Sequence, residues 1–321
     1  MSKAILKTLS VLCVLALTLA LCVSGLAEAA AVRVIALKGP TAMGLVKLMR
    51  DSEGAGTYDF NIAAAIDEVT PQIVKGDVDI ACVPANLASV LYNNTEGQVQ
   101  VLAVNTLGVL YIVENGESVQ SVADLKGKTL FASGKGATPE YALNYILSAN
   151  GIDPEADVTI EWKSEHAECL NELMAAEGGI AMLPQPFVTT AQMKAEGLRV
   201  ALDLTAEWDA LGADSTLITG VAVVRKAFAE ENPDAVNAFL DGYKASVEYV
   251  NANTAEAAAL IGGYDIVPEP VAMKALPACN ITFIEGDELQ QKLSGYLAVL
   301  FEAEPKSVGG KLPEEDFYYK R

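Results

Sequence analysis

Short apolar runs alternate with helical patterns along most of this chain, and that alternation is the strongest constraint on its fold. The segments VRVIALKG, VDIACVPA, TLFASGKG and IAMLPQP each have the character of a buried strand, and a pattern with helical spacing follows each of them. Strands that alternate with helices in this way form mostly parallel sheets covered by helices on both faces. The sequence therefore predicts an α/β fold.

The alternation occurs in two halves. It pauses at SVADLKGK, residues 121–128, and restarts directly afterwards, whereas the chain from residue 232 onward is mainly helical in pattern. Because no low-complexity linker separates the halves, we expect two Rossmann-like α/β lobes in direct contact, with a ligand cleft between them. In the first half, residues 41–51 predict a single helix, and Thr70 with Pro71 predicts the start of a short one.

The first residues have the pattern of an export signal. Lys3 and Lys7 precede a long apolar run, which ends in small residues at Ala27 to Ala29. We expect residues 1–29 to be a signal peptide, since the apolar run is barely long enough to span a bilayer and no charged stop follows it. Cys22 leaves lipid attachment open, although Leu21 stands where a bacterial lipoprotein signal has a small residue.

Charge and cysteine content narrow the function further. The chain has 22 basic and 42 acidic residues, a net charge of −20, which opposes binding to nucleic acid or to anionic lipid head groups. Beyond the signal, Cys82, Cys169 and Cys279 are too few and too widely spaced for a disulfide framework. We expect Cys82, in an apolar run, to be buried.

Four loops that follow predicted strands carry the candidate binding groups. Ligands in parallel α/β sheets collect beyond the carboxyl ends of strands, and helix N-termini there offer free N–H donors and partial positive charge. Two such ends from opposite lobes predict a site for a polar or anionic group, with charge from Lys38 and Lys135. The loops are LKGPTAMG at residues 37–44, VPANLA around Asn86, SGKGAT at residues 133–138, and LPQPFV around Gln185.

Known catalytic and phosphate-binding motifs do not fit. The loop SGKGATPE lacks the spacing of a Walker phosphate loop and of a dinucleotide fingerprint. The single histidine, His166, stands in HAEC, but the paired cysteines of a zinc deaminase are missing. We expect His166, Glu168 and Cys169 to begin a helix whose exposed face they line. No metal or cofactor is predicted, while acid–base catalysis by Asp and Glu stays open.

The chain resembles the extracellular substrate-binding proteins of ABC importers, in the branch for nitrate, sulfonate and taurine. The resemblance rests on the segments VRVIALKGPTAMGLVKLM, GDVDIACVPANLASVLYN, DLKGKTLFASGKGATPEYALNYIL and AMLPQPFVTTAQMK. It implies a type II periplasmic-binding-protein fold, with residues 32–110 and 220–321 in lobe 1 and residues 111–219 in lobe 2. Gln185 departs from the glutamate common in the LPQPF turn.

The same resemblance implies the function. It predicts the solute-binding component of an ABC import system: an exported monomer without enzymatic activity, in the periplasm or on the outer face of the cytoplasmic membrane. Its partners would be a small polar or anionic molecule and the transmembrane permease subunits. The cleft positions it implies are Lys38, Gly39, Thr41, Met43, Asn86, Asn105, Ser133, Lys135, Ala137, Thr138 and Gln185, with Thr106 as a further candidate.

Two rival functions remain. One is an enzyme on the same fold, similar to the pyrimidine-precursor synthases of thiamine metabolism, which consume a cleft histidine. Against it stand the export signal and the prediction that His166 lies away from the strand-end loops. The other is a sensory ligand-binding module, for which this sequence shows no kinase or channel segment.

Overall fold

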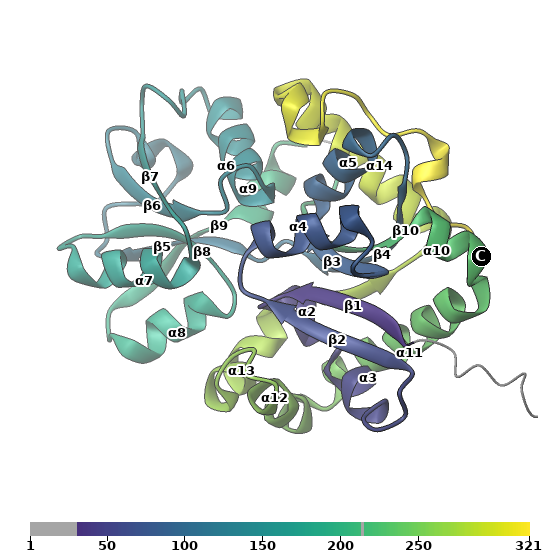
Figure 1. The fold of residues 1–321 in the computed structure, drawn as a ribbon. Coiled ribbons are helices and arrows are strands. Elements are labelled where there is room, and N and C mark those ends of the chain that lie inside the picture. Colours follow the sequence, from purple (N-terminus) through teal and green to yellow (C-terminus); the bar gives the residue numbers. More distant parts are fainter. Residues whose placement is uncertain (1–30, 213–214) are drawn as a thin grey trace, which may run out of the picture.

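The computed structural model describes residues 31–212 and 215–321, and it is a mixed α/β structure built on two separate sheets (Figure 1). The predicted signal peptide and Cys22 lie outside the described residues. None of the helices within the described ranges combines the length and the apolar character needed to cross a bilayer. The expected α/β fold is confirmed.

The first sheet has six strands in the order β11-β4-β10-β3-β1-β2. β10 is antiparallel to both of its neighbours, whereas β1 is parallel to β2 and β3. β4 therefore runs in the same direction as β3. The strand bounds are β1 (Val32–Leu37), β2 (Tyr58–Ala63), β3 (Ile80–Pro84), β4 (Val99–Leu107), β10 (Ile218–Arg225) and β11 (Ile281–Ile284).

The second sheet has five strands in the order β7-β6-β8-β5-β9. β5 is antiparallel to β8 and β9, and β6 is parallel to β7 and β8. The strand bounds are β5 (Leu110–Asn115), β6 (Thr129–Ser133), β7 (Thr159–Lys163), β8 (Ile180–Pro184) and β9 (Leu198–Asp203).

Helices cover both faces of each sheet, as buried parallel strands require. Side chains of alternate residues on β1 show this, because Ile35 belongs to one core cluster while Val34 and Ala36 belong to another. The helices are α2 (Pro40–Met43), α3 (Val46–Asp51), α4 (Ile66–Lys75), α5 (Ala85–Asn94), α6 (Thr138–Ala149), α7 (His166–Ala175), α8 (Phe187–Lys194), α9 (Leu204–Ala210), α10 (Lys226–Glu231), α11 (Pro233–Ala252), α12 (Thr254–Gly263), α13 (Glu269–Ala275) and α14 (Gly286–Ala303).

The chain passes between the sheets twice. β4 of the first sheet ends at Leu107 and β5 of the second begins at Leu110, whereas β9 ends the second sheet and β10 returns to the middle of the first. The two sheets accordingly occupy opposite sides of the molecule (Figure 1). α14 lies at their junction, because its Tyr296 ring stands 5.6 Å from the ring of Trp208 on α9.

Two local predictions are wrong. The helix expected from Thr70 begins at Ile66, because the Glu68 carboxylate accepts the free Ala65 N–H and caps an earlier first turn. The helix expected over residues 41–51 is two helices, α2 and α3, separated by a turn at Gly44. A Cβ at Gly44 would lie 3.1 Å from the Ile281 side chain.

The last part of the chain is mainly helical, as expected. It also contains the four-residue strand β11, which adds an edge to the first sheet beside β4. Cys82 is fully buried, as predicted.

Candidate functional site

The candidate loops follow strand ends in both sheets. These strand ends lie on either side of the first crossover, where the chain passes from β4 of the first sheet to β5 of the second. In the first sheet these are the carboxyl ends of β1, β3 and β4, and in the second they are those of β6, β7 and β8. The backbone N–H of Gln185, just after β8, donates to the carbonyl of Val109 in the crossover itself at 3.0 Å. This bond fixes the edge of the second sheet against the point where the chain leaves the first.

The loop after β1 is a tight turn that hides most of its side chains. Gly39 has a φ of 125°, which disfavours any side chain, and the Thr41 hydroxyl donates to the Leu37 carbonyl at 2.7 Å. Met43 is fully buried in the core. Lys38 is exposed, with its ammonium 3.7 Å from the Asp265 carboxylate. Of these predicted site residues, Lys38 alone presents a charged group to solvent.

Asn105, Thr106 and Thr41 meet around Gly220 on β10. A Cβ on Gly220 would lie 2.5 Å from Asn105 Oδ1 and 2.7 Å from Thr41 Cγ2, so only glycine fits between them. Asn105 is fully buried; its Oδ1 accepts from the Thr106 hydroxyl at 3.0 Å, and its Nδ2 has no hydrogen-bond partner among the described residues. This end of β4 and β10 thus has a buried amide donor without a hydrogen bond of normal geometry, although the Cys82 thiol and the Tyr243 hydroxyl lie beside the Asn105 side chain.

Asn86 connects the two lobes. Its Nδ2 donates to the carbonyl of Ser307 at 3.0 Å and approaches that of Gly136 at 3.5 Å, and its Oδ1 accepts from the Thr138 hydroxyl at 3.3 Å. Thr138 Oγ1 also accepts from the Tyr296 hydroxyl at 3.3 Å. Asn86 and Thr138, predicted independently from two loops, are therefore brought together, and both are fully buried.

The glycine-rich loop at residues 133–138 turns sharply between β6 and α6. Gly134 and Gly136 have φ angles of 85° and 76°, and the Gly136 N–H donates to the Glu140 carboxylate at 2.5 Å. Ala137 precedes α6 and is buried. Lys135, at the tip of the loop, is exposed, so it stands apart from the buried groups that surround Asn86.

Ser133 contacts the chain's single histidine. Ser133 Oγ lies 2.5 Å from His166 Nδ1, and the His166 ring stands 5.2 Å from the ring of Phe187 at an interplanar angle of 52°. The prediction that His166 lies away from the strand-end loops is therefore wrong. His166 does begin α7, but the end of β7 is beside the end of β6, which places the two side chains together.

Cys169 is also placed differently from the prediction. It is fully buried one turn into α7 rather than on the exposed face. Burial raises the pKa of its thiol, and a hydrogen bond with Ser133 offsets part of that effect. Desolvation lowers the pKa of His166 to about 4, so its imidazole is neutral at ordinary pH.

Gln185 caps the helix that follows it. Its Oε1 accepts from the backbone N–H of Thr189 at 3.2 Å and from the Thr189 hydroxyl at 2.8 Å. The side chain of Gln185 is 6% exposed, and the first turn of α8 occupies its Oε1, whereas its Nε2 makes no hydrogen bond to any residue that the structure describes. A glutamate there would accept the same bonds and would add a negative charge.

Sequence reasoning missed His166 and Phe187. Both are the first residues of helices that follow strands of the second sheet, as Thr138 is in α6. The position itself was the available signal: the first helical residue after each parallel strand lies at the same edge of the sheet. Within the described ranges, no three His, Cys, Asp or Glu side chains gather closely enough to hold a metal ion.

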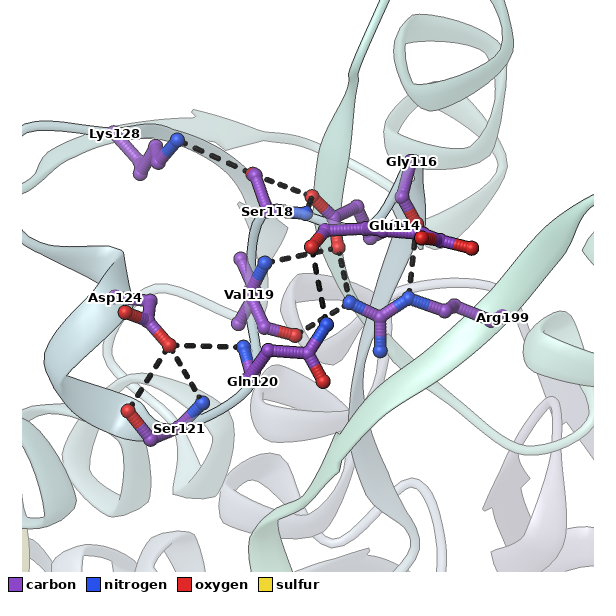
Figure 2. A network of polar contacts seen from close by, with 10 residues as sticks. Glu114, Gly116, Ser118, Val119, Gln120, Ser121, Asp124, Lys128 and Arg199 are labelled. Carbon is purple, nitrogen blue, oxygen red and sulfur yellow. Dashed lines mark hydrogen bonds and ion pairs between the residues drawn. The ribbon is translucent and has the colours of Figure 1, made fainter.

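A dense polar network lies at the opposite end of β5, away from these loops (Figure 2). Glu114 is fully buried, and its carboxylate accepts from the Ser118 hydroxyl at 2.5 Å, the Val119 N–H at 3.1 Å and Arg199 Nη2 at 2.6 Å. We assign this network to the stability of the second sheet.

A shallow surface hollow of about 470 Å³ lies against the C-terminal segment. Asp316 lines it and is paired with Lys226 at 2.8 Å, beyond the amino-terminal end of β4. Because the hollow is open and lies far from the strand ends that carry the polar groups, it is not part of the candidate site.

Comparison with known proteins shows which of them share sequence or structure with this chain. Residues 98–257 match the family described as NMT1/THI5 like. No curated protein matches the chain. Among solved structures, an ABC transporter protein from Parabacteroides distasonis has a TM-score of 0.75 and 22% identity, over 91% of this chain and 99% of that one.

Two structures with named ligands share the fold. The alkanesulfonate-binding protein SsuA from Xanthomonas axonopodis pv. citri, bound to MOPS, has a TM-score of 0.69 and 17% identity, covering 90% of this chain and 96% of that one. The periplasmic nitrate-binding protein NrtA from Synechocystis PCC 6803 has a TM-score of 0.59 and 14% identity, covering 82% and 75%. The predicted periplasmic-binding-protein fold is confirmed.

Proposed function

Starting from a chain that contains an NMT1/THI5-like segment and has the fold of ABC-transporter binding proteins, we propose that it is the solute-binding component of an ABC import system. It captures a small polar or anionic molecule between its lobes and delivers it to a membrane permease. The lobes are residues 32–110 with 220–321, and residues 111–219. The similar structures include an alkanesulfonate-binding protein bound to MOPS and a nitrate-binding protein, which favours a solute of this type.

One observation carries the proposal: buried polar side chains from both sheets gather where the chain crosses between them. Asn105 and Thr41 approach from the first sheet and Ser133 from the second, while Asn86 and Thr138 join the two. Polar groups are expensive to bury without partners, and Asn105 Nδ2 is such a group. A ligand with hydrogen-bond acceptors would satisfy it.

Binding and closure follow from these contacts. A ligand held by both edges contacts one lobe in the open form and two in the closed form, so it favours closure by its differential affinity. The backbone N–H groups at the starts of α6 and α8 add partial positive charge, and Lys38 and Lys135 add long-range attraction for anions. The closed form is the state that the permease recognises.

The location and assembly belong to the same proposal. The protein acts outside the cytoplasm after cleavage near Ala29, in the periplasm or on the outer face of the membrane, with Cys22 as the alternative anchor through lipidation. It acts as a monomer, and it releases its solute chemically unchanged.

An enzymatic role is the second candidate, because Ser133 and His166 lie 2.5 Å apart at the strand-end edge. A serine next to a neutral imidazole is the beginning of a nucleophilic site. The related structures are binding proteins, which favours binding over turnover. Recovery of an altered compound after incubation with the protein would replace transport by catalysis.

A thermal-shift screen tests the proposal. The purified protein without residues 1–29 is heated with sulfonates, nitrate, bicarbonate, thiamine precursors, amino acids and riboflavin. A ligand at 100 times its dissociation constant adds about 2.7 kcal/mol to the free energy of unfolding. The proposal is contradicted if no compound in the panel raises the melting temperature. A lysate fraction without permease, added as a source of unknown ligands, must then also leave the melting temperature unchanged.

A further inference from the structure

His166, Ser133 and Phe187 come from three adjacent strands of the second sheet. In the order β7-β6-β8, His166 follows the first strand, Ser133 ends the second and Phe187 follows the third. All three side chains therefore lie at one edge, next to the crossover. The 2.5 Å contact to Ser133 and the tilted ring of Phe187 hold the imidazole in one orientation.

Only one nitrogen of this imidazole is used by the protein. Nδ1 contacts Ser133 Oγ, whereas no hydrogen bond to Nε2 is formed by any residue in the ranges 31–212 and 215–321. The His166 side chain is partly exposed. Nε2 of His166 is thus a polar atom at the strand-end edge, and the contact between Nδ1 and Ser133 fixes the direction in which it points.

The lysine next to His166 on the β7 side is already paired with carboxylates. Lys163, at the end of β7, is paired with Glu161 at 3.1 Å and with Glu172 at 3.2 Å. Phe187 and Tyr111 are both partly buried and pack on the same apolar cluster. An inorganic oxyanion bound beside His166 would lose its hydration shell and gain contacts with only one neutral nitrogen and with aromatic carbon. This replacement is energetically unfavourable.

We propose that Nε2 of His166 hydrogen-bonds the ligand, and that Phe187 packs against an apolar or flat part of the same molecule. The inference rests on the proposed function and narrows its solute class. The ligand is an organic molecule with a polar group beside a ring or alkyl portion, rather than an inorganic anion such as nitrate. His166 selects by hydrogen bonding, and Phe187 selects by apolar contact and ring stacking.

Because the chain has one histidine, its imidazole can be followed without assignment. The protein is labelled with ¹⁵N-histidine and titrated with MOPS, benzenesulfonate, ethanesulfonate and nitrate, each up to millimolar concentration, with melting temperature measured in parallel. We expect a ring-containing probe to bind and to shift Nε2 more than Nδ1. Nitrate is expected to leave both resonances in place.

Variants separate the two side chains from general effects. His166→Gln and Phe187→Leu are each expected to weaken the organic probe about tenfold, which corresponds to about 1.4 kcal/mol. Phe301→Leu, at a partly exposed aromatic residue on α14, is the matched control and should bind as the wild type does. Ser133→Ala should alter the tautomer ratio of His166 in the free protein.

The outcomes distinguish this inference from the proposed function. A probe that binds wild type, His166→Gln and Phe187→Leu equally overturns the inference and leaves solute binding intact. Nitrate binding that shifts Nε2 overturns the solute class. A panel in which nothing binds wild type counts against both. Diethyl pyrocarbonate gives a ligand-free measurement: failure to acylate His166 in the folded protein, with acylation after unfolding, also overturns the inference.

Discussion

The side-chain oxygen of Asn86, at the start of α5, accepts a 3.3 Å hydrogen bond from the hydroxyl of Thr138, at the start of α6. Asn86 lies in a loop at the strand ends of the first sheet, and Thr138 lies in a loop at the strand ends of the second. This bond therefore spans the boundary between the lobes. Two of the residues predicted to contact ligand thus contact each other.

Asn86→Ala should destabilise the protein as well as weaken binding. The substitution leaves the carbonyl of Ser307 and the hydroxyl of Thr138 without their partner in a fully buried setting. We expect a loss of about 1–3 kcal/mol in the free energy of unfolding, measured by urea denaturation. Asn94→Ala, at the exposed end of the same helix, is the control and should change it by no more than about 0.5 kcal/mol.

Gly220→Ala tests the packing of the first sheet's strand ends. The added Cβ would stand 2.5 Å from Asn105 Oδ1 and 2.7 Å from Thr41 Cγ2, so both side chains or β10 must shift. Overpacking of this kind costs about 1–3 kcal/mol, and we expect a lower melting temperature with weaker ligand binding. Gly263→Ala, where an added Cβ would have no atom within 4 Å apart from the adjacent backbone of its own helix, should leave both unchanged. If the two substitutions had equal effects, the close packing of Asn105 and Thr41 around Gly220 would be contradicted.

We expect the buried carboxylate of Glu114 to make the stability of the folded protein partly dependent on pH in the acid range. Burial by itself raises the pKa of Glu114, but the hydrogen bonds from Ser118 and Val119 and the charge of Arg199 outweigh it, so the pKa is lowered. Because the folded pKa lies below the unfolded value of about 4.3, the stabilisation is present above that pH and is lost as pH falls through the folded pKa.

Glu114→Gln should therefore cost about 1–3 kcal/mol at pH 7 and should make stability less dependent on pH below about 4.3. Denaturant unfolding of wild type and variant between pH 3 and pH 7 measures both effects. Glu117→Gln, on the exposed side of the same loop, keeps the wild-type pH profile if the argument holds. A variant profile parallel to that of the wild type would show that Glu114 does not titrate as stated.

Asn93→Ala should loosen the C-terminal segment. Asn93 Nδ2 donates to the carbonyl of Val308 at 2.8 Å and to that of Lys311 at 2.7 Å, which holds the segment on α5. We expect faster cleavage between residues 305 and 321 in limited proteolysis, with the rest of the chain protected as before. An unchanged cleavage rate would mean that Ser89, which donates to the same Val308 carbonyl, suffices.

Strands and helices were predictable where the apolar pattern was unambiguous. β3 and β8 are buried on both faces and read as continuous apolar runs, and each is followed by its helix as expected. The start of α4 was missed because Pro71 resembles a first-turn proline, whereas the Glu68 cap decides where the helix begins. β11 was missed because four residues beside long helices give too little pattern to separate strand from loop.

The candidate site was harder to predict because proximity depends on strand order. His166 and Ser133 are 33 residues apart, and only the pairing of β6 with β7 brings them together. Likewise, nothing local indicates that Asn86 faces Thr138 or that Lys135 points away into solvent. Sequence spacing identified which loops lie at the edge, while the partners of each side chain depend on long-range packing.

The position of β10 has a consequence for how the molecule assembles during synthesis. β10 lies between β3 and β4, yet it begins at Ile218, more than a hundred residues after β4 ends at Leu107. A chain emerging from the ribosome therefore exposes its early strands before their central neighbour exists, while β5 to β9 can pair among themselves as soon as they are made. The inserted half is expected to form first, and the half that contains both ends of the described chain last.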